Sequence, residues 1–178
     1  MGCWGYGIME SDGALDFEAE FQSIANSSEG VYERSCLEAS LPELLKRARE
    51  EPVFEDQTQF RAEGYQVLTA MLMRAGCAFS EEQRAELLEG LQDCYEYRVG
   101  KAVQAALLNH TQSVEALLQQ SFEPGLSGYQ DVIERLQGRI QAIEEQAALL
   151  RAYSITGGVP VETPSRGLFE VLYEKQKQ

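Results

Sequence analysis

Apolar residues recur at every third or fourth position in one segment after another, and this spacing predicts a chain built of α-helices. Asp12 is a suitable N-cap for the first of these segments. The apolar positions of that segment are Ala14, Phe17, Phe21 and Ile24. The same periodicity places three acids, Asp16, Glu18 and Glu20, on the opposite side of the helix, where we expect them to face solvent.

Capping signals mark the helices that follow. Ser40 and Glu43 have the spacing of a capping box at the start of a second helix. A third helix is predicted over about 56–75, and Gly76 is placed to be its C-cap. Ser80 begins a fourth helix, again with the pattern of a capping box.

Two long periodic segments in the second half of the chain predict an αα-hairpin. Its helices cover about 101–120 and 129–153, with a turn rich in Pro and Gly between them. The apolar positions of the first helix are Val103, Ala106, Leu107, Val114, Leu117 and Leu118. The second helix has a seam close to a heptad repeat, formed by Val132, Ile133, Leu136, Ile140, Ile143, Ala147 and Leu150. This seam is either intramolecular core or the face of a homodimer, and its length of only about three heptads favours core.

These elements together predict a mainly α, single-domain helical bundle of about five to six helices. A glycine-rich segment precedes the bundle and the αα-hairpin completes it. The length of 178 residues fits one domain. The one plausible boundary lies near 123–128, and it separates an N-terminal helical region, 1–122, from a C-terminal helix, loop and tail, 123–178, packed on the same domain. A short terminal element is expected over 168–173.

The chain is strongly acidic, with a formal net charge of −14. Residues 1–60 hold 13 acids and 4 bases, a net of −9, so most of the excess lies in the first third of the chain. Such a field repels the phosphate backbone, which argues against nucleic acid as a partner. It speeds association with a basic protein, and we expect a partner of that kind.

The cysteines predict free thiols in a reducing compartment. Cys3, Cys36, Cys77 and Cys94 form no Cys-x-x-Cys pair, and the chain has one histidine, so a zinc site is not indicated. The N-terminus lacks the charged and apolar regions of a signal peptide, and no apolar run is long enough to span a membrane. We therefore expect a cytoplasmic protein that neither contacts a membrane nor uses a cofactor.

Two further patterns have a chemical interpretation beside a structural one. The glycines at 2, 5 and 7 do not follow a buried strand and precede an acidic helix start, so they favour close backbone packing over a phosphate cradle. Asp12, Asp16 and Glu20 lie four residues apart on one helix face and could hold Mg²⁺ or Ca²⁺. A cap, a first-turn acid and a surface acid explain the same three residues without a metal, and this interpretation is favoured. No residue is predicted to be catalytic.

Three aromatic residues are candidates for contact with a partner. Tyr95 and Tyr97, with Arg98 beside them, have the composition of a binding hot spot. The alternative is that one tyrosine packs in the core and the other covers its edge. Trp4, the only tryptophan, lies among the N-terminal glycines, and its indole ring is suited to anchoring that segment.

The N-terminus also resembles the signature of a bacterial family that is catalogued only as a domain of unknown function. The residues that carry this resemblance are Gly2, Trp4, Gly5 and Gly7, followed by Asp12, Ala14, Asp16 and Phe17. The match is specific over residues 1–17 and looser over the rest of the first half. Small acidic proteins of this sort are similar to immunity or inhibitor proteins of bacterial conflict systems, which neutralise a basic partner.

Three functions therefore stand as expectations. The leading one is a non-enzymatic, acidic protein-binding protein that docks through Asp12, Asp16, Glu18 and Glu20, with Trp4, Tyr95 and Tyr97 as apolar anchors. The second is a small hydrolase or transferase that uses a divalent metal on Asp12, Asp16 and Glu20. The third is a structural helical oligomer, a homodimer through the helix over 129–153.

Overall fold

The protein is an all-α, single helical domain, as the spacing of apolar residues predicts. The computed structural model describes residues 7–27, 32–50, 57–109, 113–120 and 122–163, with the backbone alone at 57–60. This part of the chain contains eight helices and no strand, and six of the helices have at least seven residues. In order they are α1 (Asp12–Ile24), α2 (Arg34–Ala39), α3 (Leu41–Arg49), α4 (Gln57–Ala75), α5 (Glu81–Gln92), α6 (Tyr95–Asn109), α7 (Val114–Gln119) and α8 (Gln130–Ala152).

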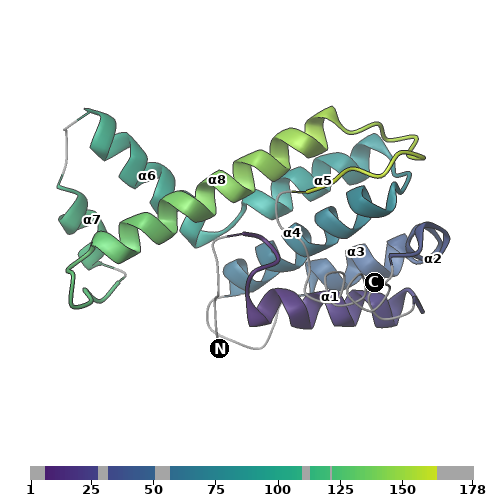
Figure 1. Ribbon diagram of the computed structural model, residues 1–178, viewed down its shortest axis with the longest axis horizontal. Helices are drawn as coiled ribbons and strands as arrows, with labels where there is room; N and C mark the ends of the chain where they lie inside the picture. Colours follow the sequence, from purple (N-terminus) through teal and green to yellow (C-terminus); the bar gives the residue numbers. More distant parts are fainter. Residues whose placement is uncertain (1–6, 28–31, 51–56, 110–112, 121, 164–178) are drawn as a thin grey trace, which may run out of the picture.

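Helix α4 lies at the centre of the molecule, with α1, α3, α5 and α8 packed around it (Figure 1). Every residue from Gly64 to Met73 is buried, which is more than one face of a helix. A helix that is buried all round has no solvent side, so its polar residues need partners within the protein. Thr69 meets this need by donating its hydroxyl to the carbonyl of Tyr65, at 2.7 Å.

The helix ends agree with the predicted caps in two cases and differ in two. The side chains of Ser80 and Gln83 form a complete capping box, and Gly76 ends α4 with a φ of +70°, as predicted. The predicted cap at Asp12 is wrong, because the Ser11 hydroxyl accepts from the amide of Ala14 and Asp12 is already helical. Ser40 occupies the N-cap position of α3 as predicted, but the predicted capping box is wrong, because its side chain makes no cap hydrogen bond.

The predicted C-terminal hairpin is corrected in its first arm. The chain from 101 to 120 is not one helix, because α6 ends at Asn109 and α7 begins at Val114, where the Ser113 hydroxyl is the N-cap. The partner of α8 is therefore mainly α6. The second arm is confirmed as α8, and its seam is core: Leu136, Ile140, Ile143, Ala147 and Leu150 are buried within the single chain.

Two apolar clusters divide the described residues into a body and a projection. The body is formed by α1 to α5 and the C-terminal half of α8, and it contains the large core. The projection is formed by α6, α7 and the first half of α8, and it extends to the left in Figure 1. Its core has three fully buried side chains, Val103, Leu118 and Leu136. The projection therefore buries far less apolar area than the body.

Glycines set the closest approach at two helix contacts. A Cβ atom at Gly90 of α5 would lie 2.3 Å from the ring of Tyr65 on α4. A Cβ atom at Gly100 of α6 would lie 2.1 Å from Cδ1 of Ile140 on α8. Both distances are shorter than any real contact, so only glycine allows these helices to pack as they do.

Candidate binding surfaces

The acidic face predicted on α1 is only partly formed. Asp16 is exposed and Asp12 is half-exposed in the first helical turn, where its charge suits the helix dipole. Glu18 is fully buried, so its predicted position on the solvent side is wrong. The Tyr32 hydroxyl donates to the Glu18 carboxyl group, so this buried polar side chain has a hydrogen-bond partner within the body.

Glu20 is held by a basic residue of the same chain. Arg47 of α3 donates to both carboxylate oxygens of Glu20, at 2.6 and 2.9 Å. The same guanidinium lies over the ring of Phe17, 5.4 Å from its centroid. Arg47 therefore neutralises Glu20 and ties α3 to α1, and the acidic face that remains on α1 consists of Asp12 and Asp16.

The structure does not bring the predicted metal ligands together as a site. Among the residues that the structure describes, no group of three or more His, Cys, Asp or Glu side chains is placed to hold a metal ion. The Glu20 carboxylate, which would have been one ligand, is already bound by Arg47. Of the three predicted ligands, the described structure therefore leaves only the carboxylates of Asp12 and Asp16 outside the ion pair with Arg47.

Tyr95 and Tyr97 do not form one exposed patch. Tyr95 packs against Phe122 in the projection, with ring centroids 6.1 Å apart. Tyr97 packs against the core of the body. Arg98 binds Asp93, at 3.0 Å, so its charge is directed at a neighbour in the chain. Trp4, Cys3, Gly2, Gly5 and His110 lie outside the described residues.

The described cysteines have the properties of structural thiols. Burial raises the pKa of Cys77 to about 12 and also raises the pKa of Cys94. A hydrogen bond to the carboxylate of Glu33 raises the pKa of Cys36, which is only half-buried. All three are free, and none has the lowered pKa that a nucleophilic thiol requires.

A shallow pocket of about 200 Å³ lies between α4 and α5. It is lined by Arg61, Tyr65, Glu86, Glu89, Gly90 and Asp93. Asp93 is paired with Arg61 at 2.7 Å, and Glu86 is paired with Arg49 at 2.5 Å. Two of the three acids that line the pocket are therefore paired with arginines of the same chain.

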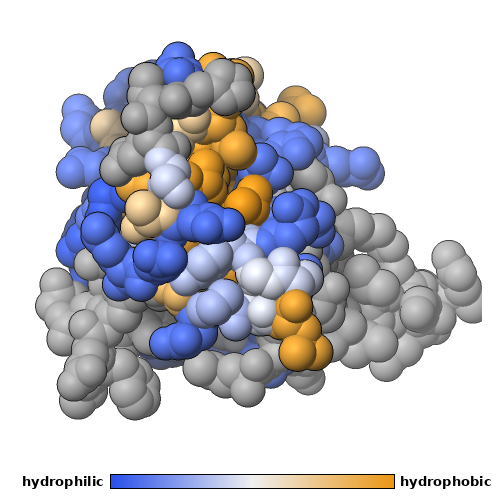
Figure 2. All heavy atoms as spheres, turned by 90° about the vertical axis from the view of Figure 1, so that its left-hand side faces the viewer, coloured by the Kyte–Doolittle hydropathy of each residue, from blue (hydrophilic) through white to orange (hydrophobic). Residues whose placement is uncertain are grey.

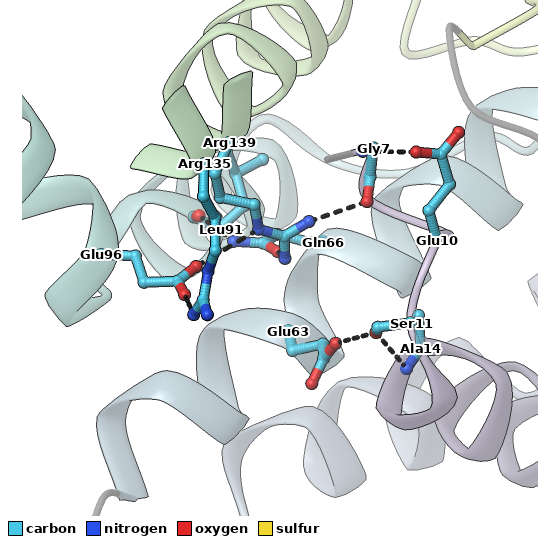
Figure 3. A network of polar contacts seen from close by, with 10 residues as sticks. All are labelled: Gly7, Glu10, Ser11, Ala14, Glu63, Gln66, Leu91, Glu96, Arg135 and Arg139. Carbon is cyan, nitrogen blue, oxygen red and sulfur yellow. Dashed lines mark hydrogen bonds and ion pairs between the residues drawn. The ribbon is translucent and has the colours of Figure 1, made fainter. Parts of the chain in front are cut away.

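A mostly buried arginine joins four parts of the fold (Figure 3). Arg139 of α8 donates to the carbonyl of Gly7, at 2.9 Å, and to the side-chain oxygen of Gln66 on α4, at 2.6 Å. Its Nε lies 3.6 Å from the carboxylate of Glu96 on α6. The segment Gly7 to Glu10, in which Ile8 and Met9 are buried, is thereby fastened to the body. The described part of the glycine-rich segment has a structural role.

Sequence reasoning missed the surface at the end of the projection. Figure 2 shows this end face on, with apolar residues gathered over its middle and hydrophilic residues on either side. Its most exposed apolar side chains are Leu107 and Leu108 at the end of α6 and Leu126 in the turn before α8. Leu107 was given only as an apolar position of the helix predicted over 101–120; it is 40% exposed and lies two residues before the end of α6.

The charge at this end is of one sign. Residues 102–134 contain four acids and neither Lys nor Arg. The acids are Glu115, Glu123, Asp131 and Glu134, all of them exposed. We call these four acids with Leu107, Leu108 and Leu126 the tip face. The absence of Lys and Arg over these 33 positions is a signal that the sequence alone could have given.

Comparison with known proteins adds no family to this picture. No family model matches the chain, and neither the curated proteins nor the solved structures contain a significant match. The resemblance of residues 1–17 to a bacterial family therefore stays a prediction. Among the described helices, none is both long enough and apolar enough to cross a membrane.

Proposed function

We propose that this chain is a non-enzymatic, acidic protein-binding protein whose partner is a basic protein. The observation that carries the proposal is the excess of acids, 29 against 15 basic residues, which gives a net charge of −14. A potential of that sign accelerates encounter with a basic surface and repels nucleic acid. The resemblance of the N-terminal residues and the acidity suggest an immunity or inhibitor protein of a bacterial conflict system, acting in the cytoplasm.

The partner-facing residues differ from those the sequence suggested. Glu18 is buried and Glu20 is neutralised by Arg47, so neither is offered as a contact residue. Asp12 and Asp16 keep their exposure on α1 and contribute to the field that steers a basic partner. Nothing in the described residues favours the metal-dependent alternative.

Affinity capture tests the function directly. The tagged protein is used to capture partners from its native host at low and at high salt, and the partners are identified by mass spectrometry. We expect one stoichiometric basic protein that is retained at low salt and lost at high salt, because salt screens the attraction between exposed charges. Capture of no protein at either salt concentration would contradict the proposed function.

A further inference from the structure

The tip face combines apolar exposure with charge of a single sign. Leu108 is 79% exposed and Leu126 is fully exposed, so each leaves most of a leucine side chain in water. The end of α6 and the turn before α8 lie at the same end of the molecule, on either side of α7 (Figure 1). Exposed leucines that share one end of a small domain with acids are typical of a protein-binding surface. No Lys or Arg lies between residues 102 and 134 to neutralise the four acids there.

Leu126 is presented by a rigid turn. The backbones of Gly125 and Gly128 form two mutual hydrogen bonds, each 3.0 Å long, on either side of Leu126 and Ser127. The Ser127 hydroxyl donates to Asp131 at 2.6 Å, which ties the turn to the first turn of α8. A side chain held outward on a closed turn loses little conformational freedom on binding, because its backbone is already ordered.

We propose that the tip face docks a basic, amphipathic segment of a partner protein. The apolar residues of that segment would cover Leu107, Leu108 and Leu126, and its Lys and Arg side chains would meet Glu115, Glu123, Asp131 and Glu134. This inference rests on the proposed function, because it assigns the place on this chain where the basic partner binds. The charge selects this occupant over a second copy, since a second copy would bring the same four acids to the interface.

The test uses a defined probe, a fluorescent synthetic helix with leucine on one face and lysine on the other. A second peptide of the same composition but scrambled order has the same charge and no apolar face. Binding is measured by fluorescence anisotropy at low salt. We expect the amphipathic peptide to bind the parent protein more tightly than the scrambled one, because only the amphipathic peptide can cover the exposed leucines.

Two substitutions in the tip face are compared with one elsewhere. In Leu108→Ser with Leu126→Ser, affinity for the amphipathic peptide should fall by at least about tenfold, since each leucine would otherwise be buried in the complex. Both side chains are exposed, so the fold is unaffected and circular dichroism should be unchanged. Val159→Ser is the matched control: Val159 is another exposed apolar residue, 71%, in the loop that follows α8, and its loss should leave affinity unchanged.

A charge reversal tests how much the acids of the tip face contribute to binding. Glu115→Lys with Glu123→Lys should weaken binding of both peptides, whereas Glu162→Lys, also at an exposed position, should have a smaller effect.

Equal binding by the parent and the two-leucine variant would overturn the tip face as the docking site, although the proposed function would stand with a site elsewhere. A parent dimer in sedimentation that the two-leucine substitution abolishes would also overturn it, because the occupant would then be a second copy. The proposed function itself fails only if affinity capture finds no partner.

Discussion

At the scale of single residues, buried or half-buried carboxylates are matched to specific donors. Glu18 meets Tyr32, Glu20 meets Arg47, and Glu38 accepts from the amide of Ala78 at 2.7 Å. The amide of Ala78 and the guanidinium of Arg34 hold the pKa of Glu38 below its ordinary value. The acidity of the chain is therefore of two kinds: some acids join helices within the fold, and others are left for contact outside it.

Glu86 is an acid that joins helices within the fold, and its contribution to stability can be tested by substitution. Arg49 and, more weakly, Tyr65 donate to its carboxylate and hold the pKa of Glu86 below its ordinary value. Because the folded pKa is below the unfolded pKa, this stabilisation is complete above the unfolded value, about 4.3, and is lost as the pH falls through the folded value. In Glu86→Gln, the free energy of unfolding should fall by up to about 1 kcal/mol at neutral pH, since the Arg49 side chain is 55% exposed.

Thermal unfolding of the parent and Glu86→Gln over a series of pH values measures this effect. The gap in Tm between the two proteins should narrow as the solution is acidified below the unfolded pKa. In an Arg49→Met background, the same substitution should produce a much smaller gap, because the main donor is absent. A gap that widens in acid would show that Glu86 is not stabilised in its charged form.

At the scale of helices, the contact of α6 with α8 depends on the missing side chain at Gly100. We expect Gly100→Ala to destabilise the protein by about 1–3 kcal/mol, because the new methyl group would overlap Cδ1 of the fully buried Ile140. The change also removes a helical glycine, which alone would stabilise a helix by up to about 1 kcal/mol. Urea denaturation measures the net effect.

A second substitution identifies the cause of that loss. Ile140→Val removes the Cδ1 atom and should itself destabilise the protein by about 0.5–1.5 kcal/mol. Combined with Ile140→Val, the change at Gly100 should be less harmful than in the parent, since the closest overlap is gone. Strict additivity of the two losses would argue that Gly100 matters for a reason other than contact with Ile140.

The sequence predicts helices best where a long apolar pattern ends in clear caps. The helices predicted over 56–75 and 129–153 occur as Gln57–Ala75 and Gln130–Ala152. The break between α6 and α7 was missed because polar residues from Asn109 to Ser113 fit the solvent side of a helix as well as a loop. Burial of Glu18 was missed because its partner, Tyr32, lies beyond the helix, and periodicity does not report such contacts.

The candidate site was predicted least well, and for a physical reason. Net charge can be counted from the sequence, but the acids neutralised within the fold are known only from their neighbours, as Arg47 shows for Glu20. Leu126 was not considered because an apolar residue in a turn has no periodic pattern. Its exposure follows from the closed geometry between Gly125 and Gly128.

At the scale of the whole molecule, Arg139 connects segments that are far apart in the chain. Arg139→Met should reduce the free energy of unfolding by about 2–4 kcal/mol, because it leaves the buried oxygen of Gln66 without its charged donor. The amides of Ile8 and Met9 should also lose protection, since Gly7 would no longer be fastened to α8. Denaturation and hydrogen exchange measure the two effects.

Arg135→Met is the control on the same helix. Arg135 also binds Glu96, but its side chain is 53% exposed against 11% for Arg139. Its loss should therefore change stability by less than about 1 kcal/mol and leave the exchange at Ile8 and Met9 unaltered. Equal losses in the two variants would mean that Arg139 is no more than another surface ion pair.

The burial of α4 on all sides has a consequence for the order in which the chain can fold during synthesis. Two of its covering contacts come late: Gln146 donates to the carbonyl of Gln66 across 80 positions, and Arg139 donates to the side chain of Gln66 across 73. A nascent chain that ends before α8 cannot cover this side of α4, and its apolar surface stays open to water and to other proteins. The body is therefore expected to close only after α8 has left the ribosome, which makes the late-synthesised helix decisive for the first half of the chain.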